Sequence, residues 1–255
     1  MRKRLIAGNW KLNGNWALCE QFTATFASLP AASLEAIMQQ ADVVICPSAV
    51  YLSRFDALIQ STSSIVQLGA QDVSTESQGA YTGEIAASML AESGAGFGIA
   101  GHSERRHRFA ETDQQVVQKM LNLFAANILP IVCVGEPIEQ REAGSAESFI
   151  EAQLLPVAAA IAEHGLVGRP MAIAYEPIWA VGTGKSATPE QAQSMHAFIR
   201  SVMARFMDAD SLRIIYGGSV TPANATALMA MPDIDGALIG GASLNPEQFV
   251  ALASV

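Results

Sequence analysis

Short apolar runs alternate with longer amphipathic segments from one end of the chain to the other. The runs are bounded by polar or turn-forming residues, as is typical of short strands that are buried on both faces. Eight such runs are present, at residues 5–7, 43–46, 65–68, 96–100, 128–134, 171–175, 212–216 and 237–239. Near-continuous apolar runs of this kind favour a parallel sheet whose two faces are both covered.

The segments between the runs repeat their apolar residues three and four positions apart, which is the period of an amphipathic helix. Clear examples are residues 16–29, 113–126, 146–163 and 189–207. Two helix starts are marked by a threonine that precedes a proline, at Thr188 and at Thr221. The chain therefore alternates predicted strands with predicted helices.

A strand followed by a helix, repeated about eight times, predicts a parallel (β/α)₈ barrel with the helices outside. A doubly wound open sheet is the rival architecture. Against it, no Gly-x-Gly-x-x-Gly turn follows the first run, and the number of strands favours closure. No linker or low-complexity tract interrupts the pattern, so we expect one domain over residues 1–255.

The composition supports a folded protein with a large core. Of the 255 residues, 50% are hydrophobic and only 15% are charged. The first apolar run is too short for the core of a signal peptide, and no run reaches the roughly 18 residues that cross a bilayer. The three cysteines have no paired spacing suited to zinc or to a redox motif. We expect a cytoplasmic protein with no membrane span and no metal site.

The charge balance argues against a nucleic-acid partner. A formal net charge of −9 provides no general basic face for phosphates to bind. The one dense basic cluster is Arg105, Arg106, His107 and Arg108. Such a cluster is more often a solvated or ion-paired helix face than a ligand site. An anionic ligand would therefore need donors elsewhere.

In a (β/α)₈ barrel the functional groups follow the strands at one face of the barrel. Polar residues and glycines stand at these positions in this chain. They are Asn9 and Lys11 after the first run, His102 and Glu104 after the fourth, Glu136 after the fifth, Glu176 after the sixth, Ser219 after the seventh, and Gly240 with Gly241 after the eighth. Each alone has an ordinary structural explanation, but their shared placement predicts a site.

The segment around Glu176 carries most information. The carboxylate directly follows a predicted buried strand and precedes Pro177, Trp179 and a loop that contains Gly182 and Gly184. Glycines permit backbone geometries that other residues resist, so the segment is typical of a catalytic base beneath a closing lid. The alternative is an ordinary strand-to-helix loop with a solvated glutamate.

Six motifs in order resemble the triosephosphate isomerase family, whose fold is the TIM barrel, over essentially the whole chain. They are Gly8-Asn9-Trp10-Lys11, Gly79-Ala80-Tyr81-Thr82-Gly83-Glu84, Gly101-His102-Ser103-Glu104-Arg105-Arg106, the stretch around Glu176, Tyr216-Gly217-Gly218-Ser219 and Gly240-Gly241. The resemblance implies the interconversion of dihydroxyacetone phosphate and glyceraldehyde 3-phosphate without a metal or organic cofactor. This reaction belongs to glycolysis and gluconeogenesis.

Moving a carbonyl by one carbon requires a base and groups that stabilise an enediolate. Glu176 is the expected base, and exclusion of water by the lid should raise its basicity. A helix that begins near Ser103 should disfavour protonation of His102, so that a neutral imidazole donates to the substrate oxygens and moves protons between them. Lys11 and Asn9 are expected to stabilise the oxyanion and bind the phosphate.

The backbone amides near Gly182, Ser219, Gly240 and Gly241 are expected to hold the phosphate, because glycine allows an anion to approach closely. The resemblance further implies that Ser103 and Glu104 support the reacting groups. For Glu104, an ion pair with a nearby arginine is the open alternative. It also implies a homodimer, in which the loop carrying Tyr81 and Thr82 enters a second subunit near Asn9 and Lys11.

Two other functions remain open at this point. A barrel that binds phosphate could isomerise a larger sugar phosphate or an aminated analogue, although the enclosed set of Asn9, Lys11, His102 and Glu176 points to a small substrate. A catalytically silent binding or scaffold protein could use the same fold.

Overall fold

The computed structural model describes residues 2–180, 187–208 and 211–255. Eight parallel strands close into a barrel in sequence order, from β1 through β8 and back to β1. Their bounds are β1 Arg4–Asn9, β2 Ala41–Cys46, β3 Gln67–Ala70, β4 Ala95–Ala100, β5 Leu129–Val134, β6 Met171–Tyr175, β7 Leu212–Tyr216 and β8 Gly236–Ile239. The expected (β/α)₈ barrel is confirmed, and the open-sheet alternative is wrong.

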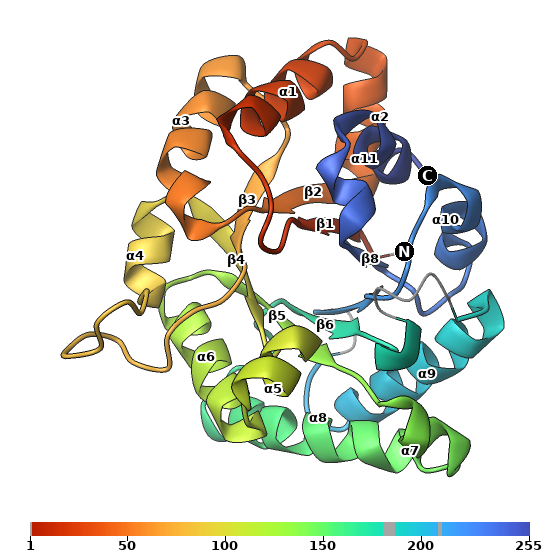
Figure 1. Ribbon diagram of the computed structural model, residues 1–255. Helices are drawn as coiled ribbons and strands as arrows, with labels where there is room; N and C mark the ends of the chain where they lie inside the picture. The colour runs from red at the N-terminus through yellow and green to blue at the C-terminus, as the bar shows by residue number, and fades with distance from the viewer. Residues whose placement is uncertain (1, 181–186, 209–210) are drawn as a thin grey trace.

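Helices surround the barrel on all sides (Figure 1). The α-helices are α1 Trp16–Ala27, α2 Ala31–Gln40, α3 Leu52–Thr62, α4 Ala87–Glu92, α5 Ser103–Phe109, α6 Asp113–Ala125, α7 Ile138–Glu142, α8 Ala146–Glu163, α9 Pro189–Met203, α10 Pro222–Met229 and α11 Pro246–Ala253. Three short 3₁₀ helices are η1 Ala49–Tyr51, η2 Ile178–Ala180 and η3 Gly241–Leu244. Among the described residues, none of these helices has the length and apolar character needed to cross a membrane.

Several helix boundaries follow from capping residues. Thr112 and Thr188 each accept a hydrogen bond from the third helical residue, Gln115 or Gln191, whose side chain returns the contact. The helix α8 has the bounds expected from its apolar period. These caps fix where the helices begin and therefore where the preceding loops end.

Alternate residues of the strands build two separate layers of core. One set of side chains fills the inside of the barrel: Leu5, Ala7, Val44, Cys46, Phe97, Ile99, Ile131, Cys133, Ala172, Ala174, Ile215 and Leu238. The other set, such as Ile6, Ile45 and Ile173, packs against the helices. Because side chains fill the barrel interior, the polar residues that follow the strands stand over a packed floor.

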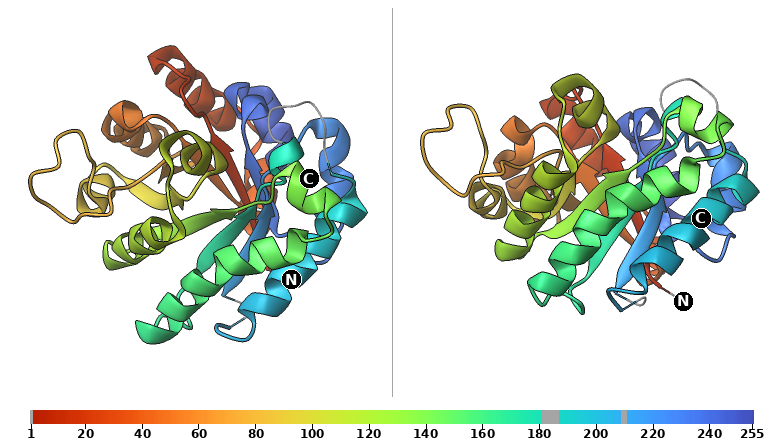
Figure 2. Two further views of the ribbon diagram at one scale, coloured as in Figure 1. Left: turned by 60° about the horizontal axis from the view of Figure 1, so that its bottom comes forward. Right: turned by 90° about the horizontal axis from the view of Figure 1, so that it is seen from below.

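The loop between β3 and α4, residues 71–86, projects away from the barrel (Figure 2). This loop is the main departure from a rounded outline. The first strand begins beside the N-terminus, at the end of the barrel opposite to the carboxyl ends of the strands (Figure 2).

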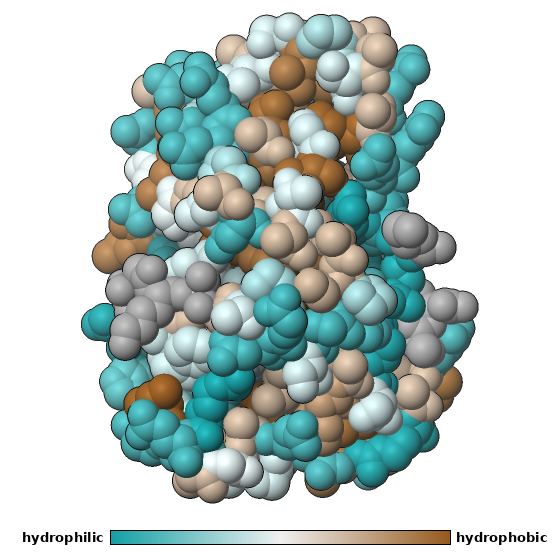
Figure 3. Space-filling view, turned by 90° about the vertical axis from the view of Figure 1, so that its right-hand side faces the viewer, coloured by the Kyte–Doolittle hydropathy of each residue, from teal (hydrophilic) through white to brown (hydrophobic). Residues whose placement is uncertain are grey.

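The side of the molecule that carries α9, α10 and α11 mixes polar side chains with a group of apolar ones in its upper half (Figure 3).

Candidate active site

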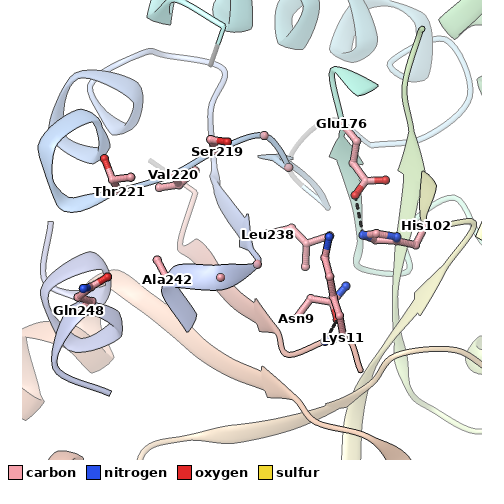
Figure 4. A pocket seen from close by; sticks show the side chains of 14 residues that line it. Asn9, Lys11, His102, Glu176, Ser219, Val220, Thr221, Leu238, Ala242 and Gln248 are labelled. Atoms are coloured by element: carbon pink, nitrogen blue, oxygen red, sulfur yellow. Dashed lines mark hydrogen bonds and ion pairs between the residues drawn. The ribbon is translucent and has the colours of Figure 1, made fainter. Parts of the chain in front are cut away.

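Glu176 and His102 meet at the carboxyl ends of β6 and β4 (Figure 4). The Nε2 atom of His102 lies 2.9 Å from Oε1 of Glu176, and the amide nitrogen of Ser103 donates to Oε2 at 2.8 Å. Glu176 is only 2% exposed and His102 only 5%. A solvated loop glutamate, the alternative from the sequence, is therefore wrong.

The tautomer of His102 follows from its second nitrogen. The amide nitrogen of Glu104, in the first turn of α5, donates to Nδ1 at 3.2 Å, so Nδ1 carries no proton. The proton of the neutral ring then resides on Nε2, which donates to Glu176. The start of α5 thereby orients the imidazole as well as binding it.

The pKa of His102 differs from the expectation. Burial lowers it, but the Glu176 carboxylate beside the ring raises it by more, so that the pKa lies above its ordinary value. The prediction that the helix beginning near Ser103 disfavours protonation of His102 is therefore wrong for this arrangement, in which Glu176 touches the ring. The effect of the helix is a directed hydrogen bond to Nδ1 instead.

Glu176 is stabilised as a carboxylate where it lies. Burial raises its pKa, but His102 and the donors of Ser103 lower it further, so the pKa lies below its ordinary value. The resting contacts thus make Glu176 a weaker base than a carboxylate of ordinary pKa.

Two glycines make room for Glu176. A Cβ atom at Gly217 would lie 2.7 Å from Cγ of Glu176, and one at Gly135 would lie 2.0 Å from its carbonyl oxygen. Both distances are shorter than packed carbon and oxygen atoms tolerate. The backbone and side chain of Glu176 therefore pass between the ends of β5 and β7 because neither neighbour has a side chain.

Lys11 stands in a left-handed backbone conformation, with φ of 53°. This conformation costs a residue with a side chain about 1 kcal/mol or more, so other contacts must hold it. The side chain of Asn9 accepts from the amide of Lys11 at 2.9 Å, and Nε2 of Gln71 donates to its carbonyl at 2.9 Å. The strained backbone directs the ammonium group toward the space in front of β8, where it approaches the position that a Cβ of Gly240 would take.

The ion pairs around Lys11 answer the question left open for Glu104. Oε1 of Glu104 lies 2.8 Å from Nζ of Lys11, so its partner is the lysine and not an arginine. The arginines of the basic cluster pair elsewhere, Arg105 with Asp72 and Glu111 and Arg106 with Asp113. The interpretation of the cluster as an ion-paired helix face is confirmed for these two arginines.

A pocket of about 400 Å³ opens at this end of the barrel (Figure 4). Asn9, Lys11, His102, Glu176, Ser219, Gly240 and Gly241 all line it, as their positions after the strands predict. Thr221, Leu238 and Gln248 also line it and were not singled out from the sequence. Leu238 belongs to an apolar run, and Gln248 lies in an amphipathic helix, so neither carries a local signal of a site.

Gly182 lies outside the described residues. On the two sides of residues 181–186, Oγ of Ser219 donates to the carbonyl of Ala180 at 3.2 Å, and the amide of Ala187 donates to the hydroxyl of Tyr216 at 3.1 Å. Both ends of this segment are thus tied to the end of β7. The lid predicted from the sequence stays a prediction.

Glu136 follows β5 but does not line the pocket. Its buried Oε1 atom accepts from the Tyr175 hydroxyl and from the Trp179 ring nitrogen, each at 3.0 Å, and lies 3.1 Å from Arg141. Glu136 therefore anchors the strand and η2 that flank Glu176. In the described part of the chain, no group of three His, Cys, Asp or Glu side chains is arranged to hold a metal ion.

Tyr81 and Thr82 do not line the pocket that holds Glu176 and His102. They lie in the projecting loop, where Tyr81 is 49% exposed. A second pocket of about 570 Å³ lies beside the first and shares Asn9, Lys11 and His102 with it. Glu104 and the exposed side chains of Leu12 and Phe109 complete its wall.

Comparisons with known proteins agree with this geometry. A family model described as "Triosephosphate isomerase" matches residues 4–255. The triosephosphate isomerase of Xanthomonas axonopodis pv. citri is 48% identical over 99% of this chain and 98% of its own length. That of Stenotrophomonas maltophilia is 47% identical over 99% and 98%, and that of Paracidovorax citrulli is 46% identical over 98% and 97%. The chain belongs to the triosephosphate isomerase family.

Proposed function

We propose that the protein interconverts dihydroxyacetone phosphate and D-glyceraldehyde 3-phosphate through an enediolate, using its own side chains and no cofactor. The contact between Glu176 and His102, in a pocket shared with Lys11 and the glycines after β8, carries the proposal. The proposal is supported by a carboxylate, an imidazole and an ammonium group that line one small space. One barrel supplies all of them, as a single catalytic domain.

Glu176 removes the proton from the carbon next to the carbonyl. To do so, its carboxylate leaves the Ser103 amide and the His102 ring, which now hold both of its oxygens. Leaving these donors removes the contacts that lower its pKa, while burial continues to raise it. The proton acceptor is therefore a stronger base at the substrate than in its resting place.

His102 and Lys11 stabilise the oxygens that gain charge. The Nε2 proton of His102 is available for a substrate oxygen once Glu176 has moved, and Nδ1 stays bound to the Glu104 amide. Proton transfer between the two substrate oxygens then requires only Nε2. The Lys11 ammonium and the Asn9 amide add donors to the same pocket.

The phosphate occupies the side of the pocket formed by Ser219, Gly240 and Gly241. Ser219 precedes α10, and Gly240 and Gly241 stand at the start of η3; the first amides of a helix have no hydrogen-bond partner within the helix. A Cβ at Gly241 would meet no described atom within 4 Å, so the space next to this backbone is open to an anion. Gly182 is proposed to contribute a further amide.

A homodimer is supported by exposed apolar side chains, two of which, Leu12 and Phe109, line the second pocket. The large apolar side chains of Leu12, Val50, Phe109 and Met89 are all more than half exposed, which is costly for a monomer. We infer that the projecting loop of a second copy fills the pocket, so that the partner's Thr82 lies near Asn9 and Lys11. Sedimentation at micromolar concentration should show a particle of about twice the chain mass of 26.9 kDa. A single species at the mass of one chain would contradict the dimer.

We place this activity in the cytoplasm, as part of glycolysis and gluconeogenesis, because a phosphorylated triose is the proposed substrate and its reaction is reversible. The reduced state of all three cysteines is compatible with this location.

The test is the rate of glyceraldehyde 3-phosphate isomerisation by the purified protein, beside the Glu176→Gln variant. Glutamine keeps the shape of the side chain but accepts no proton, so kcat should fall by at least about a thousandfold. An active wild type with an equally active variant would overturn the role of Glu176. Inactivity of both would favour a larger phosphorylated substrate or a binding protein.

A further inference from the structure

The backbone just before His102 is held by two charged side chains. The amide of Gly101 donates to Oε1 of Glu111 at 2.9 Å, and Nε of Arg106 donates to the Gly101 carbonyl at 2.8 Å. Glu111 is 8% exposed, and the Arg106 side chain is 15% exposed. The two peptide groups on either side of Gly101 therefore have fixed, well-buried partners.

Arg106 makes three further hydrogen bonds. Its Nη2 donates to the carbonyl of Cys133 at the end of β5 at 3.1 Å, and its Nη1 donates to Asp113 at 2.5 Å. Its own amide donates to the His102 carbonyl at 3.1 Å, as the Arg105 amide does at 2.8 Å. One arginine thus contacts the residue before His102, His102 itself and the neighbouring strand.

A glycine is needed at position 101 for this arrangement. Gly101 has φ of 75°, and a Cβ there would lie 3.0 Å from Nη2 of Arg106 and 2.7 Å from Cγ2 of Val116. The guanidinium group occupies the space that a side chain at this position would take.

The strand that Arg106 contacts, β5, also binds the backbone of Glu176. Cys133 pairs with Ala174 in the ladder between β5 and β6, and the Glu176 amide donates to the carbonyl of Val134 at 2.8 Å. Arg106 therefore links the strand end that holds His102 to the strand end that positions Glu176.

We propose that Arg106 is a positioning residue for the isomerisation, because it sets the place of His102 relative to Glu176 by bridging the carbonyls of Gly101 and Cys133. It contacts no substrate. The inference depends on the proposed role of His102. A lysine in its place keeps the charge beside Asp113, but a single ammonium group lacks the planar fork that reaches both carbonyls and the carboxylate.

Arg200 provides a matched control. Its side chain is also mostly buried, with 13% exposure, and its guanidinium group bridges Asp233 and Asp235 while also donating to the carbonyl of Leu212. These partners lie at the amino ends of β7 and β8, away from the pocket. Arg200→Lys therefore removes a comparable ionic network without touching the support of His102.

The experiment compares kcat and KM of Arg106→Lys and Arg200→Lys, together with the ¹⁵N chemical shifts of the His102 ring and the melting temperature. Displacing a reacting group by about 1 Å costs on the order of 100-fold in rate, so kcat of Arg106→Lys should fall about 10- to 100-fold. KM should stay within about twofold, and the His102 ring signals should shift. Arg200→Lys should melt at a similarly lowered temperature with kcat and ring signals close to wild type.

Three results would overturn the proposal: wild-type kcat in Arg106→Lys, unchanged ring signals in that variant, or an equal loss of kcat in Arg200→Lys. If Arg106→Lys does not fold, Asp113→Asn replaces it, since this change loosens Arg106 without removing it. A smaller fall in kcat with shifted ring signals is then expected, and unchanged kcat counts against the idea. His102→Gln is measured in parallel, because an active His102→Gln enzyme would refute the role of His102 rather than that of Arg106.

Discussion

A buried histidine outside the pocket predicts how the protein responds to acid. His196 on α9 is fully buried between the rings of Tyr175 and Tyr216. Its Nδ1 lies 3.2 Å from the carbonyl of Asp233, and among the described residues its Nε2 has no hydrogen-bond partner. A proton added to Nε2 would therefore be buried with no acceptor in hydrogen-bonding geometry among the described residues.

Burial lowers the pKa of His196 to about 4, although the Asp233 carbonyl and the Asp235 carboxylate act in the opposite direction. In the unfolded chain the ring has its ordinary value of 6.5. Above pH 6.5 the ring is neutral in both states and costs nothing. Between pH 6.5 and 4 only the unfolded chain binds the proton, so stability falls by about 1.4 kcal/mol per pH unit, to a total of about 3 kcal/mol.

The assay is urea unfolding of the wild type and of His196→Gln at pH 7.5 and pH 4.5, at one protein concentration because association affects stability. Glutamine has no group that titrates in this range, so the variant should lose about 2.5 kcal/mol less than the wild type between the two pH values. His164→Gln, at an exposed helix end, should behave as wild type. Equal losses in wild type and His196→Gln would refute the reasoning.

Three further changes probe the pocket. Lys11→Met should weaken binding of a phosphorylated inhibitor about 10- to 100-fold in a calorimetric titration, because a charged hydrogen bond is lost, and normal affinity would contradict its role. Gly241→Ala should raise KM about tenfold without lowering the melting temperature, because the added methyl group meets no described atom within 4 Å but enters the proposed phosphate site. Gly217→Ala should lower kcat about tenfold or more in the coupled assay, because its methyl group would lie 2.7 Å from Cγ of Glu176 and displace the carboxylate; an unchanged kcat would count against the close fit.

Apolar runs predicted the barrel well but misplaced some boundaries. The third run, residues 65–68, begins two residues before the observed strand Gln67–Ala70 and ends two residues before its end. This strand contains an exposed glutamine, a glycine and an alanine, so its own residues carry little apolar signal, whereas Ile65 and Val66 precede it. The predicted helix at residues 189–207 ends at Met203, although buried Met207 continues the apolar pattern into the following turn. Burial in a turn and burial in a helix give the same pattern.

Site residues that stand directly after a buried strand were predictable from the sequence. Contacts between side chains that only the closed barrel brings together were not. Polar residues directly after buried strands identified Asn9, Lys11, His102 and Glu176. The contact between Glu176 and His102 joins residues 74 positions apart on strands that are not neighbours, so no local pattern reports it. The raised pKa of His102 follows from that contact and was missed for the same reason.

The contact also couples substrate binding to release of the base. In the resting arrangement the Nε2–H group of His102 donates a hydrogen bond to Glu176, and in the proposed reaction the same N–H group donates to a substrate oxygen. A neutral ring has only one such proton, since Nδ1 is occupied by the Glu104 amide. A substrate oxygen that accepts this hydrogen bond therefore removes one of the contacts that lower the pKa of Glu176. In the proposed reaction, substrate binding at His102 would thus free Glu176 and strengthen it as a base when a carbon acid is present, whereas without substrate the carboxylate keeps the contacts that lower its pKa.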